Sequence, residues 1–144
     1  MAQLVTVEGL KQVEKTLRDV TPRQSRNIMR RLVVRIAASV RDDVRKAARS
    51  VVKRRTGNLF KAIRSKREKG RPDIFEASVI VHLKKDGSPR APHWHFIEFG
   101  TVKQSARPFI APTVIQWQAK MPQVYREEFG QQLERELAKR EKRR

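Results

Sequence analysis

Apolar residues in the first part of the chain recur at the spacing of an α-helix. They lie three or four residues apart over 4–20 and predict a short first helix with one apolar face, formed by Val7, Leu10, Val13, Leu17 and Val20. A helix start signal follows directly. Thr21 can cap a helix, Pro22 suits the first helical position, and Gln24 completes a capping box. A second helix is therefore expected to begin at Pro22.

The second helix is the longest and most regular element that the pattern predicts. Its apolar residues fall within an arc of about 80° on a helical wheel, and they are Met29, Val33, Ile36, Val40, Val44, Ala47 and Val51. We expect this helix to run from Pro22 to Arg54, a length of about 50 Å. The sequence Thr56-Gly57-Asn58 is expected to end it, because glycine readily adopts the left-handed conformation that closes a helix.

Apolar and polar residues then alternate over 75–83, which predicts a half-buried strand. Its apolar face holds Phe75, Ala77, Val79, Val81 and Leu83. Before this strand, residues 59–63 fit either a helical turn or the start of a strand. Residues 66–73 fit a polar loop or the tip of a hairpin.

The segments after the strand are shorter. Residues 84–92 contain two prolines and an Asp-Gly pair, so they predict a loop. The aromatic segment 93–99 is interpreted as a strand or a tight turn that stops at Gly100. Residues 101–107 are polar, and we expect them to be mobile.

A final helix is predicted from Pro112 onward. Its apolar positions are again three or four residues apart: Val114, Trp117, Met121, Tyr125, Phe129, Leu133 and Leu137. Pro122 should kink this helix or split it in two. The sequence thus predicts one α+β domain over 1–137, in which a small antiparallel sheet packs against one long amphipathic helix with N- and C-terminal helices. The basic tail 138–144 is expected to fray.

The chain is strongly basic, and the excess charge is concentrated in one segment. Lys and Arg number 34 against 15 Asp and Glu, for a net charge of +19, and residues 21–70 hold 17 basic and three acidic residues. Such a field favours anionic partners, either nucleic acid or an acidic protein surface. The candidate contact residues lie opposite the apolar stripe of the long helix: Arg31, Arg35, Arg41, Arg45, Lys46, Arg49 and Lys53.

Composition excludes several kinds of chemistry. The chain has no cysteine, so disulfides, thiolate metal sites and cysteine catalysis are ruled out. No apolar run approaches the roughly 18 residues that a membrane helix needs, and the first residues lack the pattern of a signal peptide. We therefore expect no membrane partner.

Three histidines raise the question of a metal site. On a strand, His93 and His95 would face the same side, and His82 or Glu98 could supply a third ligand. The simpler interpretation places these histidines as polar positions around a buried Trp94. We favour the simpler interpretation and expect no metal and no cofactor.

Glu98 is a carboxylate between two apolar residues, Ile97 and Phe99. It could be a general acid or base, but no second carboxylate or nucleophile motif accompanies it. A structural role is favoured, in which Glu98 holds backbone amides of the following turn or pairs with an arginine such as Arg107. We therefore expect no enzymatic activity.

The segment Ala-Arg-Pro-Phe-Ile-Ala-Pro, residues 106–112, is stiff and apolar. Phe109 could tuck under the last helix, or the segment could dock against a neighbouring subunit. Both possibilities remain open from the sequence.

Four motifs in order resemble one known family: VEGLKQVEKTL, TGNLFKAI, HFIEFGT and ARPFIAPTV. The chain is similar over about Val7 to Leu137 to the neck or tail-completion proteins of long-tailed bacteriophages, the gene-ten-like tail components. It differs from them in its Pro-His-Trp-His segment and in its unusually basic long helix.

The resemblance implies a structural virion protein, not an enzyme, that is assembled in the host cytoplasm and forms a ring at the head–tail junction or tail end. Implied partners are further copies of itself, other neck, head-completion and tail proteins, and the packaged DNA that passes through the channel. The implied interface or turn residues are Glu98, Phe99, Gly100, Thr101, Arg107, Pro108 and Phe109, with Pro112 at the approach to the last helix. The alternative function is non-specific nucleic-acid binding through the basic face of the long helix.

Overall fold

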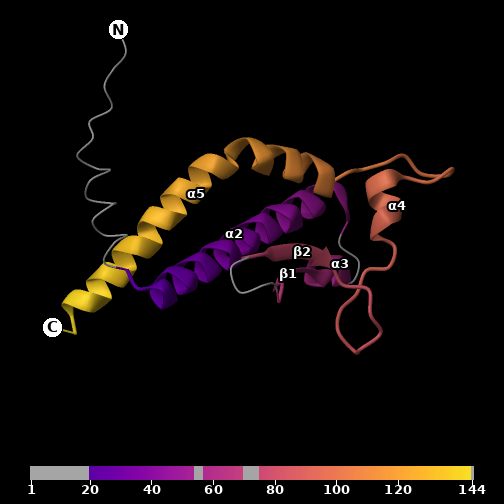
Figure 1. Cartoon of the computed structure of the whole chain (residues 1–144). Helices are drawn as coiled ribbons and strands as arrows, with labels where there is room; N and C mark the ends of the chain where they lie inside the picture. Colours follow the sequence, from indigo (N-terminus) through magenta and orange to yellow (C-terminus); the bar gives the residue numbers. More distant parts are fainter. Residues whose placement is uncertain (1–19, 54–56, 70–74, 144) are drawn as a thin grey trace, which may run out of the picture.

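The computed structural model describes residues 20–53, 57–69 and 75–143. The elements, in order, are α2 (Pro22–Val51), α3 (Asn58–Ala62), β1 (Ile63–Arg67), β2 (Ala77–Val81), α4 (Trp94–Phe99) and α5 (Ile110–Glu141). In Figure 1, α2 forms a middle layer, with α5 along one side and the two strands and α3 on the other. The predicted α+β class is confirmed, while the helix expected over 4–20 lies outside the described residues.

Helix α2 begins as the capping signal predicts. The Thr21 hydroxyl accepts the backbone N–H of Gln24 at 3.3 Å, and the Gln24 side chain accepts the backbone N–H of Thr21 at 3.0 Å. The helix ends at Val51, earlier than the expected Arg54, and Val52 is already extended. Two consecutive β-branched residues disfavour further helix there. Gly57 is left-handed as expected, with φ of 74°, but it precedes α3 instead of closing α2.

The buried face of α2 is wider than the single stripe that the sequence predicts. Leu32 and Ile36 pack with Trp117 of α5, whereas Val44 and Ala48 form a second cluster with Ile63 of β1 and with Phe109. Because α2 lies between two layers, it must be apolar on two faces. The predicted stripe omitted four residues that are buried: Ile28, Leu32, Ala37 and Ala48. Four residues that it included are only partly buried: Met29, Val40, Ala47 and Val51.

The two strands form an antiparallel hairpin that runs from Ile63 paired with Val81 to Arg67 paired with Ala77. This confirms the predicted strand, although it is shorter than 75–83 and Leu83 is exposed. The ambiguous segment 59–63 contains both alternatives, since α3 ends at Ala62 and β1 begins at Ile63.

Residues 94–99 form a helix, so the prediction of a strand or tight turn for 93–99 was wrong. Trp94 and Ile97 are partly buried and Glu98 is buried, whereas Phe96 and Phe99 are exposed. Inward positions therefore recur after three and four residues, as in a helix and not as in a strand. Gly100, with φ of 75°, ends α4 as expected.

Helix α5 is continuous and contains Pro122, and Figure 1 shows it bending along its length, as a proline within a helix predicts. Pro112 lies in its first turn as predicted. Trp117 and Leu133 are buried, but Tyr125 is 37% exposed, so only part of the predicted apolar stripe of this helix is buried. The helix continues to Glu141, through residues 138–141 of the segment expected to fray. None of the helices in the described ranges is long and apolar enough to span a membrane.

Candidate interaction surfaces

Glu98 is a buried carboxylate that holds the start of α5. Its Oε2 accepts the backbone N–H groups of Phe109 at 2.8 Å and Ile110 at 3.0 Å, and its Oε1 accepts that of Ala111 at 2.8 Å. The first N–H groups of a helix lack partners within the helix, and a negative charge is favourable at that end. The structure thus has Glu98 binding backbone amides, but those of the next helix and not of the following turn. It fixes α4 against α5.

The chain between α4 and α5 folds into a tight turn. Thr101 and Gln104 exchange two backbone hydrogen bonds of 2.8 and 3.2 Å, and the Arg107 N–H donates to the Ile97 carbonyl at 2.8 Å. At Gly100, a Cβ would lie 2.7 Å from the Ala106 nitrogen. The positive φ and this close approach both require glycine, so the turn is sterically defined.

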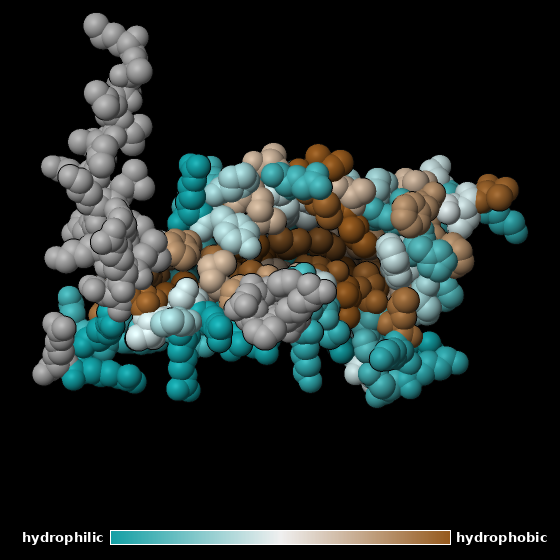
Figure 2. Space-filling model, in the orientation of Figure 1, coloured by the Kyte–Doolittle hydropathy of each residue, from teal (hydrophilic) through white to brown (hydrophobic). Residues whose placement is uncertain are grey.

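Three apolar side chains project from α4 and this turn. Phe96, Phe99 and Val102, here called the apolar tip, are 43%, 74% and 107% exposed. In Figure 2 the outermost point of this end of the molecule is brown, with paler and teal surface beside it. Phe109 is instead 1% exposed and packs with Val44, Ala48 and Ile63, so its side chain lies in the core between α2 and β1, at the start of α5. A cluster of exposed apolar residues is typical of a protein–protein contact.

Four of the seven basic candidates, all four on α2, are engaged within the molecule. Arg31 pairs with Glu136, and Arg35 Nε lies 3.0 Å from Glu128 Oε2, so both tie α2 to α5. Arg41 pairs with Asp42 and donates to Ser65 Oγ at 3.3 Å. Arg45 donates through Nε and Nη2 to the Ile63 carbonyl, at 3.0 and 2.7 Å. The basic face is therefore partly a set of structural contacts.

These contacts alter the titration of Glu136. Burial raises the pKa of its carboxyl group, but hydrogen bonds and charges from Lys139 and Arg31 outweigh burial and hold the pKa below its usual value. The pKa of Arg45 is also lowered, because burial and the positive charge of the neighbouring Arg41 both disfavour its charged form. Both side chains are also held by contacts within the fold, Glu136 with Arg31 and Arg45 with the Ile63 carbonyl.

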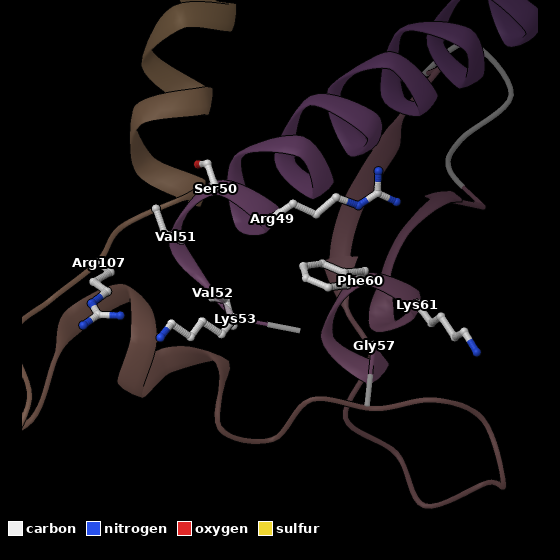
Figure 3. Close-up of a pocket in the computed structure, with 9 residues that line it drawn as sticks. All are labelled: Arg49, Ser50, Val51, Val52, Lys53, Gly57, Phe60, Lys61 and Arg107. Carbon is white, nitrogen blue, oxygen red and sulfur yellow. The ribbon is translucent and has the colours of Figure 1, made fainter. Parts of the chain in front are cut away.

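The remaining candidates, Lys46, Arg49 and Lys53, are exposed on the second half of α2 and just beyond it. Arg49 and Lys53 line a cavity of about 910 Å³, together with Lys61 and Arg107. Figure 3 shows these side chains with Phe60, over which the Arg49 guanidinium lies at 5.7 Å from the ring centroid. This basic pocket was not anticipated, because Lys61 and Arg107 come from separate segments. Their positive charge was the only signal in the sequence.

The histidines do not form the arrangement considered for a metal. His93 and His95 lie at the start of α4, where residues two apart do not share a side. His82 Nε2 instead lies 3.0 Å from Asp86 Oδ1, and hydrogen bonds from His82 and the Ser88 N–H hold the pKa of Asp86 well below its usual value. Among the described residues, no group of three His, Cys, Asp or Glu side chains could hold a metal ion.

A small α+β fold with an exposed apolar tip and a basic pocket offers two surfaces for contacts with other molecules. A family model described as "Bacteriophage HK97-gp10, putative tail-component" matches residues 5–100, about two thirds of the chain. The chain belongs to this HK97-gp10-like family of bacteriophage tail components. No curated protein and no solved structure matches it significantly.

Family membership confirms the resemblance drawn from the sequence, and with it a structural role in the virion tail and contacts with other tail proteins. The match includes α4 and ends at Gly100. The turn after α4, the ARPFIAPTV motif and α5 therefore lie beyond the matched residues.

Proposed function

We propose that this tail component is a ring-forming neck or tail-completion subunit that joins head and tail around the DNA channel, with no enzymatic activity. The apolar tip is the observation that carries the proposal. Phe99 is largely exposed and Val102 fully exposed, yet Glu98 and Gly100 hold their backbone in a defined conformation. A rigid apolar projection is stable in water only at a cost, and burial against a neighbouring subunit removes that cost.

A ring follows if the tip of each copy packs against a different surface of the next copy. Such head-to-tail contacts between identical subunits form a closed ring when the rotation between copies closes. The net charge of +19 suits a wall beside packaged DNA. Dispersed Lys and Arg side chains neutralise phosphates without reading bases, so DNA could pass without being held at one sequence.

The test is quantitative mass spectrometry of purified particles, combined with a double variant of the tip. The proposal expects a fixed copy number, about six or twelve per particle, as a closed ring requires. Phe99→Ser with Val102→Ser should leave the isolated protein folded, because both side chains are exposed, but should abolish its incorporation into particles. Leu83→Ser is the matched control, since Leu83 is also exposed and apolar but lies after β2, away from the tip.

Two outcomes would contradict the proposal. One is absence of the protein from mature particles while it is abundant in infected cells. The other is normal incorporation of the tip variant at an unchanged copy number. Variable copy number from particle to particle would contradict the ring alone and leave the tail role intact.

Non-specific nucleic-acid binding is the second candidate, and it is favoured by the exposed Lys46, Arg49 and Lys53 at one end of α2. A salt titration of duplex DNA binding separates the two functions. Tight binding near physiological salt with a steep salt dependence would support this candidate. Weak binding under those conditions would leave assembly as the function.

A further inference from the structure

The basic pocket gathers four positive side chains from three parts of the chain. Arg49 comes from the end of α2, Lys53 from the chain just beyond it, Lys61 from α3, and Arg107 from the segment before α5. The other lining residues that the structure describes are Ser50, Val51, Val52, Gly57 and Phe60, and none of these described residues is acidic. In Figure 3 the charged ends of Lys53 and Arg107 lie on one side of the pocket, and those of Arg49 and Lys61 point to the other side, so the rim of the pocket is positive on both sides.

Elsewhere on α2, positive side chains contact acceptors within the molecule. Arg31 and Arg35 pair with glutamates of α5, and Arg45 donates to the Ile63 carbonyl. Within the described ranges, no carboxylate lies at ion-pair distance from Lys53, Lys61 or Arg107. In Figure 3 the Lys53 side chain points toward that of Arg107. Two cations that face each other without an intervening anion repel, so bound negative charge would stabilise this arrangement.

The backbone around the pocket is held in place before any ligand binds. The Arg107 N–H donates to the Ile97 carbonyl at 2.8 Å. Shortly after it, the backbone N–H groups of Phe109 and Ile110 donate to the Glu98 carboxylate. Arg49 lies over the ring of Phe60 at 5.7 Å. A preorganised site loses less conformational freedom on binding, which favours affinity.

We propose that the basic pocket binds an acidic segment of another protein of the tail or neck. The residues that line the pocket favour a protein ligand over DNA. Val51, Val52 and Phe60 give the cavity apolar surface between its cations, which suits a peptide that carries carboxylates beside an apolar side chain. A DNA duplex is convex and offers mainly phosphates, so it matches flat or protruding basic surfaces better than an apolar-walled cavity. The inference rests on the tail-component role but not on ring formation.

The first test is zero-length carbodiimide cross-linking of purified particles, followed by mass spectrometry. This reagent joins a lysine amine to a carboxylate that it touches, so Lys53 and Lys61 should be linked to Asp or Glu of a different tail or neck protein. The Lys120–Asp43 pair, at 3.2 Å, provides an internal control within the same chain. If the control link forms while Lys53 and Lys61 remain unlinked, the proposal is wrong. Links only to another copy of this chain, or only to DNA after ultraviolet irradiation, also overturn it.

The second test uses the isolated full chain and does not require particles. The probes are a fluorescein-labelled peptide of alternating glutamate and leucine, its glutamine–leucine counterpart, and a duplex oligonucleotide. Lys53→Glu with Arg107→Glu should weaken the glutamate peptide about tenfold or more. The charge-matched control is Arg30→Glu with Lys46→Glu, at exposed positions on α2 outside the pocket. Its effect on the peptide should stay within about twofold.

Equal weakening by both double variants, or equal binding of the glutamine peptide, would overturn the proposal. So would a larger loss of duplex binding than of peptide binding in the pocket variant. If charge reversal at the pocket prevents folding, Lys53→Gln with Arg107→Gln gives the same comparison without adding negative charge. This test needs no particle. Absence of the protein from virions would therefore refute the proposed function, and the peptide titration would still test ligand binding by the pocket.

Discussion

The Glu98 carboxylate and the Phe109 backbone N–H form a 2.8 Å hydrogen bond between two buried residues that belong to different parts of the fold. Glu98 lies on α4, which carries the apolar tip, whereas Phe109 packs in the core with Val44 and Ile63. The position of the exposed tip is therefore set by a buried polar contact with the core. This relationship links the stability of the fold to the geometry of its assembly surface.

Glu98→Ala should lower the free energy of unfolding by about 2–4 kcal/mol, because three backbone amides lose their acceptor. Glu98→Gln should cost less, since one oxygen still accepts, although its NH₂ group faces an N–H donor. Urea denaturation of the isolated protein measures both changes. Glu127→Ala is the control on α5, where the side chain is exposed and accepts a hydrogen bond from Gln123. An equal, small effect of the Glu98 and Glu127 variants would show that the three hydrogen bonds add no stability.

Gly100→Ala should be strongly destabilising, because the new Cβ would meet the backbone of Ala106 and Gln104 at 2.7 and 2.9 Å in a positive-φ conformation. Gly130→Ala provides the contrast, since nothing lies within 4 Å of a Cβ in the middle of α5. That change should stabilise the helix by about 0.5–1 kcal/mol. Thermal unfolding should shift down for the first variant and up for the second. A shift of the same sign in both would contradict the steric argument.

Arg45→Ala should reduce stability more than it reduces DNA affinity. The guanidinium donates twice to the Ile63 carbonyl at the start of β1, and its loss leaves this acceptor without those donors. We expect a cost of about 1–3 kcal/mol. Lys46→Ala, at the next position and exposed, should change stability by less than about 0.5 kcal/mol. Urea midpoints and duplex DNA titrations on both variants distinguish the two roles, and loss of DNA affinity without loss of stability at Arg45 would oppose this assignment.

The α2–α5 contact should weaken in acid because of Glu136. Its folded-state pKa is lower than the usual 4.5, so its contribution to stability is fully present above pH 4.5 and is lost as the pH falls through the lower folded value. Glu136→Gln should therefore be less stable than the parent at neutral pH, and the difference should shrink below pH 4.5. Urea midpoints across this range test the expectation. Glu134→Gln, at an exposed neighbouring position, is the control variant.

Local signals predicted much of the fold. The start of α2 depends on Thr21, Pro22 and Gln24 alone, and the alternating strand lies within a few residues of its expected bounds. The two buried faces of α2 could not be predicted, because a periodic pattern does not say how many layers cover a helix. Helix α4 was misassigned because six residues are too short for a period of two and a period of 3.6 to be separated.

For the candidate functional residues too, the sequence identified individual residues, and the tertiary structure was needed to show their partners. Glu98 could be selected from the sequence, because a carboxylate between apolar neighbours needs partners when buried. Its actual partners belong to Phe109, Ile110 and Ala111, and only the tertiary structure brings them to it. The basic pocket depends on long-range packing in the same manner, since Lys61 and Arg107 are far apart in sequence.

The ion pair between Arg31 and Glu136 joins residues that are 105 positions apart in the chain. Contacts of such long separation form slowly, because a long loop must close before they contribute stability. During synthesis, the face of α2 that α5 covers remains without its partner until nearly the whole intervening chain has emerged. The nascent protein therefore passes through a long period in which Leu32 and Ile36 lack the Trp117 side chain that covers them. Chaperone supply and translation rate should consequently affect the yield of this protein more than that of a domain whose helices pair with their nearest neighbours.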